Sequence, residues 1–150
     1  ETVIRVNDDI KHRMIEKLRD LCDGTFNGKI ISVLGVTFKP NTDDMRDAPS
    51  LTIVPALVGG GAKVRVVDPQ GFREGEALLP GVNWNDDPYK ASQNADLVVL
   101  LTEWNEFRAL DLARMAQTLG DKILVDLRNI YSHSEVTQAG LAYRSIGRPG

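Results

Sequence analysis

The stretch that decides the fold covers residues 30–50 and reads Ile30-Ile31-Ser32-Val33-Leu34-Gly35-Val36-Thr37-Phe38-Lys39-Pro40-Asn41-Thr42-Asp43-Asp44-Met45-Arg46-Asp47-Ala48-Pro49-Ser50. It begins with a β-branched run that is hydrophobic on both faces, which is typical of a central parallel strand. A long polar loop then leads to Pro49, a residue favoured in the first turn of a helix. Because ligands of open α/β sheets bind at the carboxyl ends of the strands, this loop, with Lys39 and Arg46, is predicted to bind a ligand.

Helices and strands alternate in the prediction for the rest of the chain. An amphipathic opening helix is predicted from apolar residues at spacings of three and four, which are Val3, Val6, Ile10, Met14, Leu18 and Leu21. The alternation predicts an α/β fold with a doubly wound, mostly parallel, Rossmann-like sheet and right-handed crossovers. Beyond the first strand, strands are predicted at residues 63–67, 82–84, 95–101, 122–127 and 141–146, and helices at 50–60, 88–94, 105–119 and 134–139.

The composition is that of one globular domain, with 150 residues of which 42% are hydrophobic and 26% charged. A formal net charge of -3 argues against a general nucleic-acid binder. No apolar run approaches the roughly 20 residues of a membrane-spanning helix, so no membrane partner is predicted. The start at Glu1, without a signal peptide, is compatible with a fragment of a longer protein. A single cysteine, Cys22, fits a soluble protein of the reducing cytoplasm.

Three cations are predicted to meet at the carboxyl edge of the sheet. Lys39 and Arg46 follow the first strand, and Arg128 follows the strand predicted at residues 122–127. Together they suit a diphosphate, because charge-assisted hydrogen bonds to phosphate are strong and the arginine fork can hold two oxygens at once. Taken singly, each is more often a solvated charge paired with a neighbouring aspartate, and this alternative stays open.

Other candidate sites have weaker support. Gly35 is not followed by the further glycines of a dinucleotide fingerprint, so Asp68 is interpreted as a turn residue and not as the ribose-binding acid. The pair Asp43 and Asp44 lacks a third spaced ligand, so no metal site is predicted. The remaining candidates are Trp104, which either walls the site or packs as a loop anchor, and the predicted surface residues His12 and His133.

Three motifs in order carry a family resemblance. They are Gly-Val-Thr-Phe-Lys-Pro-Asn-Thr-Asp-Asp-Met-Arg-Asp-Ala-Pro-Ser at residues 35–50, Leu-Thr-Glu-Trp-Asn-Glu-Phe at 101–107 and Val-Asp-Leu-Arg-Asn at 125–129. Together they resemble the C-terminal domain of the UDP-glucose/GDP-mannose dehydrogenase family, over nearly the whole chain. The resemblance implies an enzyme that oxidises the C6 alcohol of a nucleotide sugar to a carboxylate, using NAD twice. UDP-glucose is the implied substrate, and GDP-mannose or a UDP-N-acetylhexosamine is the alternative.

The same resemblance implies roles for particular residues. Phe38, Lys39 and Arg128 would contact the nucleotide sugar, whereas Arg46 would face NAD, which the other domain of these enzymes mainly binds. Residues 1–24 would belong to the helix that links the two domains and lies at the dimer interface of the family. Residues 25–150 would form the nucleotide-sugar-binding domain of a homodimer.

Catalysis is not expected from this chain alone. The catalytic cysteine of the family lies in a Gly-Gly-x-Cys-Phe-Pro-Lys-Asp segment that this sequence lacks, so Cys22 is interpreted as structural. No residue of the chain is therefore assigned a catalytic role. A rival interpretation is a non-catalytic doubly wound binding or receiver module, since a fold does not by itself fix a function.

Overall fold

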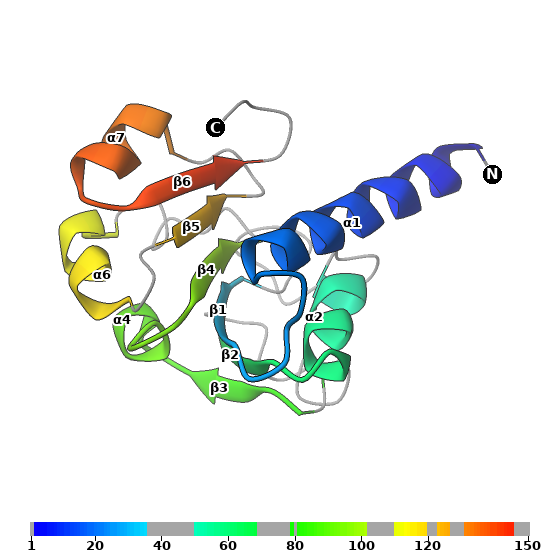
Figure 1. Cartoon of the computed structure of the whole chain (residues 1–150), viewed down its shortest axis with the longest axis horizontal. Coiled ribbons are helices and arrows are strands. Elements are labelled where there is room, and N and C mark those ends of the chain that lie inside the picture. Colours follow the sequence, from blue (N-terminus) through cyan, green and yellow to red (C-terminus); the bar gives the residue numbers. More distant parts are fainter. Residues whose placement is uncertain are drawn as a thin grey trace.

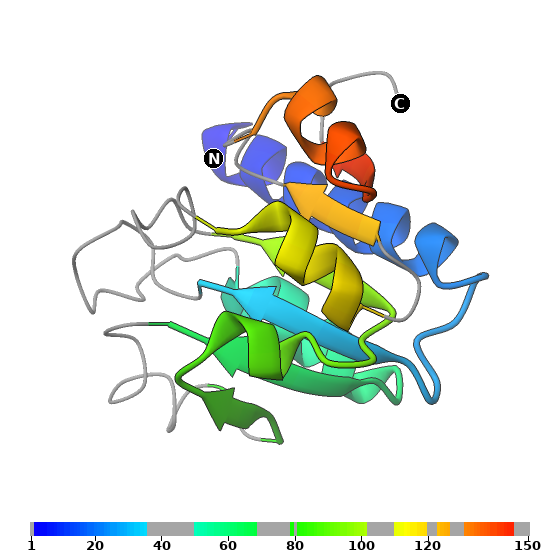
Figure 2. The ribbon, with the colours of Figure 1, turned by 90° about the vertical axis from the view of Figure 1, so that its left-hand side faces the viewer.

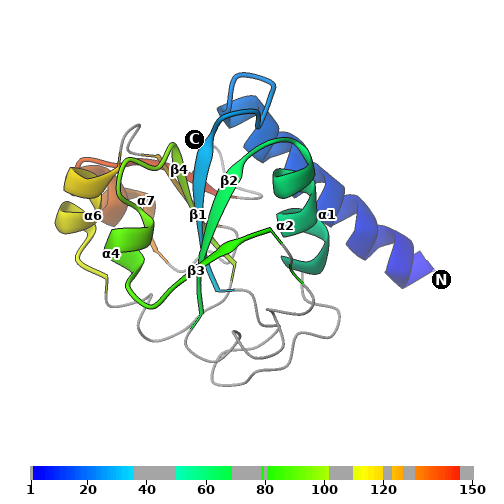
Figure 3. The same ribbon diagram turned by 90° about the horizontal axis from the view of Figure 1, so that it is seen from below.

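The protein is a three-layer α/β domain (Figure 1). A computed structural model describes residues 2–35, 50–68, 79, 81–101, 110–119, 123–126 and 131–145, with side chains described from residue 11 onward except at 50, 51 and 145. The sheet lies between α1 and α2 on one face and α4, α6 and α7 on the other, as the edge-on view of Figure 3 shows. Among the described residues, no helix is long and apolar enough to cross a membrane.

The observed elements follow the predicted order. The strands are β1 (Ile30–Leu34), β2 (Lys63–Val67), β3 (Asn83–Asn85), β4 (Leu97–Leu100), β5 (Ile123–Asp126) and β6 (Ala142–Ser145). The helices are α1 (Thr2–Leu21), α2 (Ser50–Gly59), α4 (Pro88–Ala91), α6 (Leu112–Thr118) and α7 (His133–Gln138).

The six strands of the described residues form one sheet in the order β3-β2-β1-β4-β5-β6, and every neighbouring pair is parallel. This is the strand order of the doubly wound Rossmann fold. The sequence prediction of a doubly wound, mostly parallel sheet is confirmed, and in the structure the sheet is parallel throughout. The order also differs from the 2-1-3-4-5 order of receiver-type modules, so the topology disfavours that alternative.

The sheet separates two hydrophobic cores. Along β1, Ile31 and Val33 face the core under α1 and α2, whereas Leu34 faces the core under α4, α6 and α7. Register extends this alternation across the sheet, because Val33 pairs with Val66 and with Val99 in the same core. Burial on both faces explains why β1 and β4 are hydrophobic at nearly every position.

Helix α1 covers one face of the sheet with its C-terminal half. Ile15 and Leu18 are buried against the sheet and α2, while Met14 and Leu21 are only partly buried. The predicted apolar stripe omitted Ile15, and this part of the prediction was wrong. Ile15 and Leu18 are three residues apart, so both lie on the docked face, and the stripe through Met14 and Leu21 flanks it. The N-terminal half of α1 extends beyond the sheet (Figures 1 and 3).

Two predicted helices are shorter than the sequence suggested. Helix α4 ends at Ala91 and not at residue 94, because Asn94 has a φ of 60°, a left-handed conformation that cannot continue a right-handed helix. Helix α6 begins only at Leu112, since Asp111 is extended and its side chain accepts a hydrogen bond from the Arg114 backbone N–H at 3.1 Å as an N-cap. Residues 105–109 of that predicted helix lie outside the described residues.

Candidate functional site at the carboxyl edge of the sheet

The carboxyl edge of the sheet is the candidate ligand site. Its last paired row runs through Val67, Leu34, Leu100 and Asp126, from β2, β1, β4 and β5 in turn. Figure 2 shows β1 and β5 pointing the same way, toward this edge. The winding direction reverses between β1 and β4, and ligands of open α/β sheets bind outside the carboxyl ends of the strands at such a switch point.

Gly35 sets the direction in which the chain leaves β1. It is buried and has a φ of 91°, a backbone conformation that favours glycine. Its N–H donates to the Val67 carbonyl at 2.7 Å, which continues the β1–β2 ladder by one residue, and the Leu101 N–H donates to the Leu34 carbonyl at 3.0 Å. The first glycine of the sequence motif is therefore a conformational requirement at the edge.

Asp126 places a carboxyl group in this row beside the apolar residues Val67, Leu34 and Leu100, and the row continues to Asn85 on β3 and Ser145 on β6. The residue is fully buried, and its Oδ2 accepts hydrogen bonds from the Tyr131 backbone N–H at 2.8 Å and from the Tyr143 hydroxyl at 2.9 Å. The same Tyr143 hydroxyl lies 2.8 Å from the Tyr131 carbonyl oxygen. Burial of a polar group is costly unless it is hydrogen-bonded, and these contacts offset that cost.

Tyr131 connects this group to a second part of the edge. Its hydroxyl accepts a hydrogen bond from the Leu110 backbone N–H at 3.3 Å. Burial raises the pKa of Tyr131 to about 12, while the hydrogen bond from Leu110 acts in the opposite direction. The phenol is therefore neutral at physiological pH. Tyr131, Tyr143 and the role of Asp126 are not predictable from sequence, because the partners lie up to 17 residues apart and no local pattern joins them.

The predicted ligand-binding residues Phe38, Lys39, Arg46 and Arg128 lie outside the described residues, as do Trp104 and the pair Asp43–Asp44. The structure does describe the strand ends from which their segments depart. In the sheet, β1 and β5 are separated only by β4, so their ends are about 10 Å apart at the usual strand spacing. The segment after β1 and the segment after β5 therefore begin close enough to contact one extended ligand.

Asp68 follows β2 at the same edge. Only 8% of its surface is exposed, so it is more enclosed than a solvated turn residue. The predicted turn at Asp68 involves Pro69, which lies outside the described residues.

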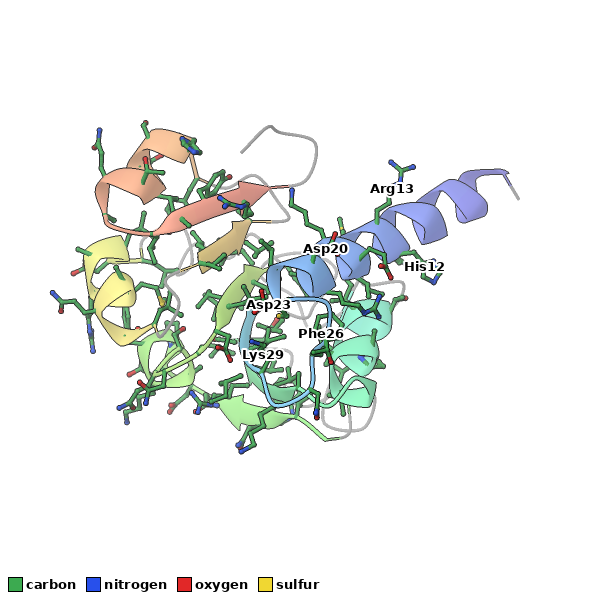
Figure 4. The ribbon with its side chains drawn as sticks, viewed as in Figure 1. His12, Arg13, Asp20, Asp23, Phe26 and Lys29 are labelled. Carbon is green, nitrogen blue, oxygen red and sulfur yellow. The ribbon has the colours of Figure 1, made fainter. Side chains whose placement is uncertain are left out.

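Cys22 lies at the opposite end of the sheet. It follows α1 in the segment that leads into β1, where Gly28 and Lys29 pair with Gly61 and Lys63 at the amino edge. Its side chain is 2% exposed and packs in the core under α1 and α2, which agrees with a structural role. Figure 4 shows this connection at Asp23, Phe26 and Lys29.

The two histidines lie on the surface, as predicted. His12 is exposed on α1 (Figure 4), and His133 is exposed while contacting Tyr143 edge-on with ring centroids 6.0 Å apart. Within the described ranges, no group of three or more His, Cys, Asp or Glu residues could hold a metal ion.

A parallel sheet in Rossmann order, with its switch point between β1 and β4, is typical of the nucleotide-binding class of α/β domains. Comparison with known proteins narrows this class. Residues 32–133 match the family described as "UDP-glucose/GDP-mannose dehydrogenase family, UDP binding domain". The chain belongs to this family, and the resemblance seen in the three sequence motifs is confirmed.

The relatives include several UDP-glucose 6-dehydrogenases. The chain is 49% identical over 149 residues to that of Rhizobium meliloti, covering 99% of this chain and 34% of the relative. It is 39% identical over 150 residues to UDP-glucose 6-dehydrogenase TuaD of Bacillus subtilis, covering 99% of this chain and 32% of the relative. The chain thus spans about a third of the length of the curated relatives it matches.

Solved structures agree with the fold. A UDP-glucose dehydrogenase from Pyrobaculum islandicum superposes with a TM-score of 0.76 at 28% identity, over 95% of this chain and 30% of that one. A UDP-D-ManNAc dehydrogenase from Pyrococcus horikoshii superposes with a TM-score of 0.72 at 27% identity, over 93% of this chain and 30% of that one.

Proposed function

We propose that this chain is the nucleotide-sugar-binding domain of a UDP-glucose 6-dehydrogenase, an NAD-dependent oxidoreductase of the cytoplasm that converts UDP-glucose to UDP-glucuronate. The observation that carries the proposal is the 49% identity to such an enzyme over nearly the whole chain. The described strand ends support it, because the neighbouring strands β1, β4 and β5 end side by side and the switch point lies between the first two of them. Residues 25–150 form the binding domain in this proposal, and residues 1–24 belong to the helix linking it to the rest of the enzyme.

The nucleotide sugar binds across the ends of β1 and β5 in this proposal. Phe38 and Lys39, after β1, and Arg128, after β5, contact the UDP-sugar, whereas Arg46 faces NAD. The charges suit a diphosphate, since each hydrogen bond between an ionised side chain and phosphate contributes roughly 1.5–3 kcal/mol. Apolar strand residues support this edge from beneath, with Leu34 and Leu100 fully buried.

The oxidation itself requires groups that this chain does not supply in the proposal. NAD, held mainly by the remaining two-thirds of the enzyme, would supply the hydride acceptor for both oxidations. Cys22 is enclosed at the amino edge of the sheet, so it does not reach a substrate bound at the carboxyl edge. We assign the catalytic cysteine to the part of the enzyme outside this chain. The role of residues 25–150 is to bind and orient the nucleotide sugar.

A different nucleotide sugar is the second candidate. The superposition on a UDP-D-ManNAc dehydrogenase favours a UDP-N-acetylhexosamine as the alternative, and the family name includes GDP-mannose. Titration of the full-length enzyme with UDP-glucose, UDP-N-acetylmannosamine and GDP-mannose separates these candidates. We expect the tightest binding and the fastest NADH formation with UDP-glucose.

Two arginine substitutions in the full-length enzyme test the site assignment. Arg128→Ala is expected to weaken UDP-glucose binding by roughly 10- to 100-fold, the equivalent of one charge-assisted hydrogen bond, and to change NAD binding little. Arg46→Ala is expected to do the reverse. Lys63→Ala is the matched control, because Lys63 is an exposed cation at the amino edge. Equal losses for both ligands in both arginine variants, measured by calorimetry, would contradict the assignment.

We also propose that α1 joins two copies of the chain in a homodimer. Helix α1 spans 20 residues, and among its side chains that the structure describes, from residue 11 onward, the apolar residues buried in its own domain are Ile15 and Leu18. Met14 and Leu21 stay partly exposed beside this face. The predicted apolar stripe continues through Ile10, Val6 and Val3 along the part of the helix that extends beyond the sheet, and a stripe of that kind marks an interaction surface.

A further inference from the structure

Asp126, Tyr131 and Tyr143 form a buried polar group that we call the anchor network. The Asp126 carboxyl accepts from the Tyr131 N–H at 2.8 Å and from the Tyr143 hydroxyl at 2.9 Å, and that hydroxyl is 2.8 Å from the Tyr131 carbonyl oxygen. None of the three side chains is more than 5% exposed. The network therefore joins the end of β5 to β6 and to the chain after residue 130.

The anchor network connects the two residues that bound the segment 127–130. Asp126 is the last residue of β5, and Tyr131 is the residue that follows the segment 127–130. The bond between the Asp126 carboxyl and the Tyr131 N–H fixes both ends of that four-residue segment relative to each other. The Tyr143 hydroxyl, on the neighbouring strand β6, contacts both Asp126 and Tyr131. Strand β6 therefore stabilises the hydrogen bond between these two residues.

A second segment ends on the same network. The Tyr131 hydroxyl accepts from the Leu110 N–H at 3.3 Å, and Leu110 is the residue that follows the segment 102–109 after β4. The backbone N–H of Tyr131 thus donates to Asp126, at the start of the segment after β5. The side-chain hydroxyl of Tyr131 accepts from Leu110, at the end of the segment after β4. Both segments depart from the carboxyl edge, next to the switch point.

Packing alone does not explain a carboxyl group at this position. In the row, Asp126 pairs with Leu100 on one side and with Ser145 on the other, and both Leu100 and the next member, Leu34, are apolar and fully buried. An apolar residue of similar volume would fill the same space without the desolvation cost of a polar group. The Asp126 Oδ2 instead accepts hydrogen bonds from the backbone N–H of Tyr131, the first residue after the segment 127–130, and from the Tyr143 hydroxyl.

We infer that Asp126, Tyr131 and Tyr143 are positioning residues for nucleotide-sugar binding. They fix the described residues that bound the segments leaving β4 and β5, and the second of these segments contains Arg128, which the proposed function assigns to the ligand. The inference rests on the proposed function of this edge. It predicts that loss of one hydroxyl in the buried network weakens nucleotide-sugar binding without removing any group that touches the ligand.

The test uses Tyr143→Phe in the full-length enzyme, with UDP-glucose and NAD titrated separately by calorimetry. We expect the Kd for UDP-glucose to rise by about tenfold, as misplacement of a binding group can produce, while the Kd for NAD changes by less than about twofold. Ser92→Ala is the matched control. It removes a buried hydroxyl that donates to the Pro88 carbonyl at 2.7 Å, on the same face of the sheet but before β4, away from the carboxyl edge. It should leave both Kd values unchanged even where the melting temperature falls.

A double-mutant cycle with Arg128→Ala separates this inference from the proposed function. If Tyr143 acts through Arg128, the Tyr143→Phe effect on the UDP-glucose Kd should shrink to less than about twofold in the Arg128→Ala background. An undiminished effect in that background overturns the inference, as does a normal Kd in Tyr143→Phe when Arg128→Ala alone weakens binding. If Arg128→Ala alone has no effect, the proposed role of Arg128 fails and the inference fails with it.

A second variant keeps the test decisive if Tyr143→Phe does not fold. Asp126→Asn preserves the side-chain volume and one acceptor oxygen but weakens the bonds from Tyr131 and Tyr143. We expect a several-fold rise in the UDP-glucose Kd at a temperature where the variant is fully folded, again without a change for NAD. A lower melting temperature with a wild-type Kd for UDP-glucose would show a purely structural role and overturn the inference.

Discussion

Three consecutive glycines at the end of α2, Gly59, Gly60 and Gly61, give the sharpest stability prediction because the structure requires glycine at only two of them. At Gly61 the φ is +97°, and an added Cβ would lie 2.8 Å from the Asn27 Oδ1 and 3.1 Å from the Asn27 Cα. At Gly60 an added Cβ would lie 2.8 Å from a ring carbon of Phe26. At Gly59 nothing lies within 4 Å.

The expected magnitudes follow from these contacts. Gly61→Ala adds a left-handed backbone cost of roughly 1–2 kcal/mol to an overlap cost of roughly 1–3 kcal/mol. The overlap cannot relax by a side-chain rotation, because one of the two atoms is backbone and the loop is fixed by the Gly28 N–H bond to the Gly61 carbonyl at 3.1 Å. Gly60→Ala has only the overlap cost of roughly 1–3 kcal/mol, since its φ is ordinary and Phe26 is buried.

Gly59→Ala is the matched control. It ends α2 and has free space around it, so alanine should stabilise the helix by up to about 1 kcal/mol. Urea unfolding followed by circular dichroism measures all three variants, and thermal melts provide a second measurement. For a chain of this size, about 2–4 °C per kcal/mol converts the expected Gly61→Ala loss of roughly 2–5 kcal/mol into a fall in melting temperature of roughly 4–20 °C.

The ranking of the three variants by unfolding free energy tests the prediction. We expect Gly59→Ala to be at least as stable as the wild type, Gly60→Ala to be intermediate and Gly61→Ala to be the least stable. A Gly61→Ala variant within about 0.5 kcal/mol of the wild type would refute the reasoning, because that is the usual scatter of surface substitutions. Such a result would mean that the connection from α2 to β2 adopts another backbone path.

Two further predictions concern the chain as a whole. The isolated 150-residue chain is expected to produce no NADH from UDP-glucose and NAD, because Cys22 is buried at the amino edge; steady NADH formation by the pure chain would contradict this. Ile10→Glu combined with Met14→Glu is expected to convert a dimer of the chain into a folded monomer in analytical ultracentrifugation, since charge would be buried at the interface. The control is Arg5→Glu with His12→Glu, positions roughly opposite on the helix, and a wild-type chain that is already monomeric at high concentration would reject the proposed dimer.

The sequence determined the class of fold because its signals are local. Continuous hydrophobic runs at β1 and β4 indicate strands covered on both faces, and the alternation with helices requires parallel strands joined by crossovers. The strand at Lys63–Val67 was predicted with its observed bounds. The family was also identified from local motifs, since Gly35 and the residues after it form one continuous stretch.

Boundaries that depend on single backbone conformations were predicted less well. The end of α4 depends on the positive φ of Asn94, and the start of α6 depends on the cap at Asp111. Ile15 was omitted from the apolar stripe, although it and Leu18 are the residues that dock α1. Helical spacing is equally compatible with a buried stripe through Met14 and with one through Ile15. Only contact with α2 and the sheet determines that the stripe through Ile15 is the buried one.

The strand order and the anchor network were decided only by the tertiary structure. Periodicity shows that strands are parallel, but the pairing of β1 with both β2 and β4, which creates the switch point, depends on how the helices pack on the two faces. Asp126, Tyr131 and Tyr143 come together because β6 pairs beside β5. That pairing joins hydrogen-bonding groups far apart in the chain, and a polar residue acquires its role from such neighbours. Sequence fixes which residues carry hydrogen-bonding groups, and the packing of the sheet fixes which of them meet.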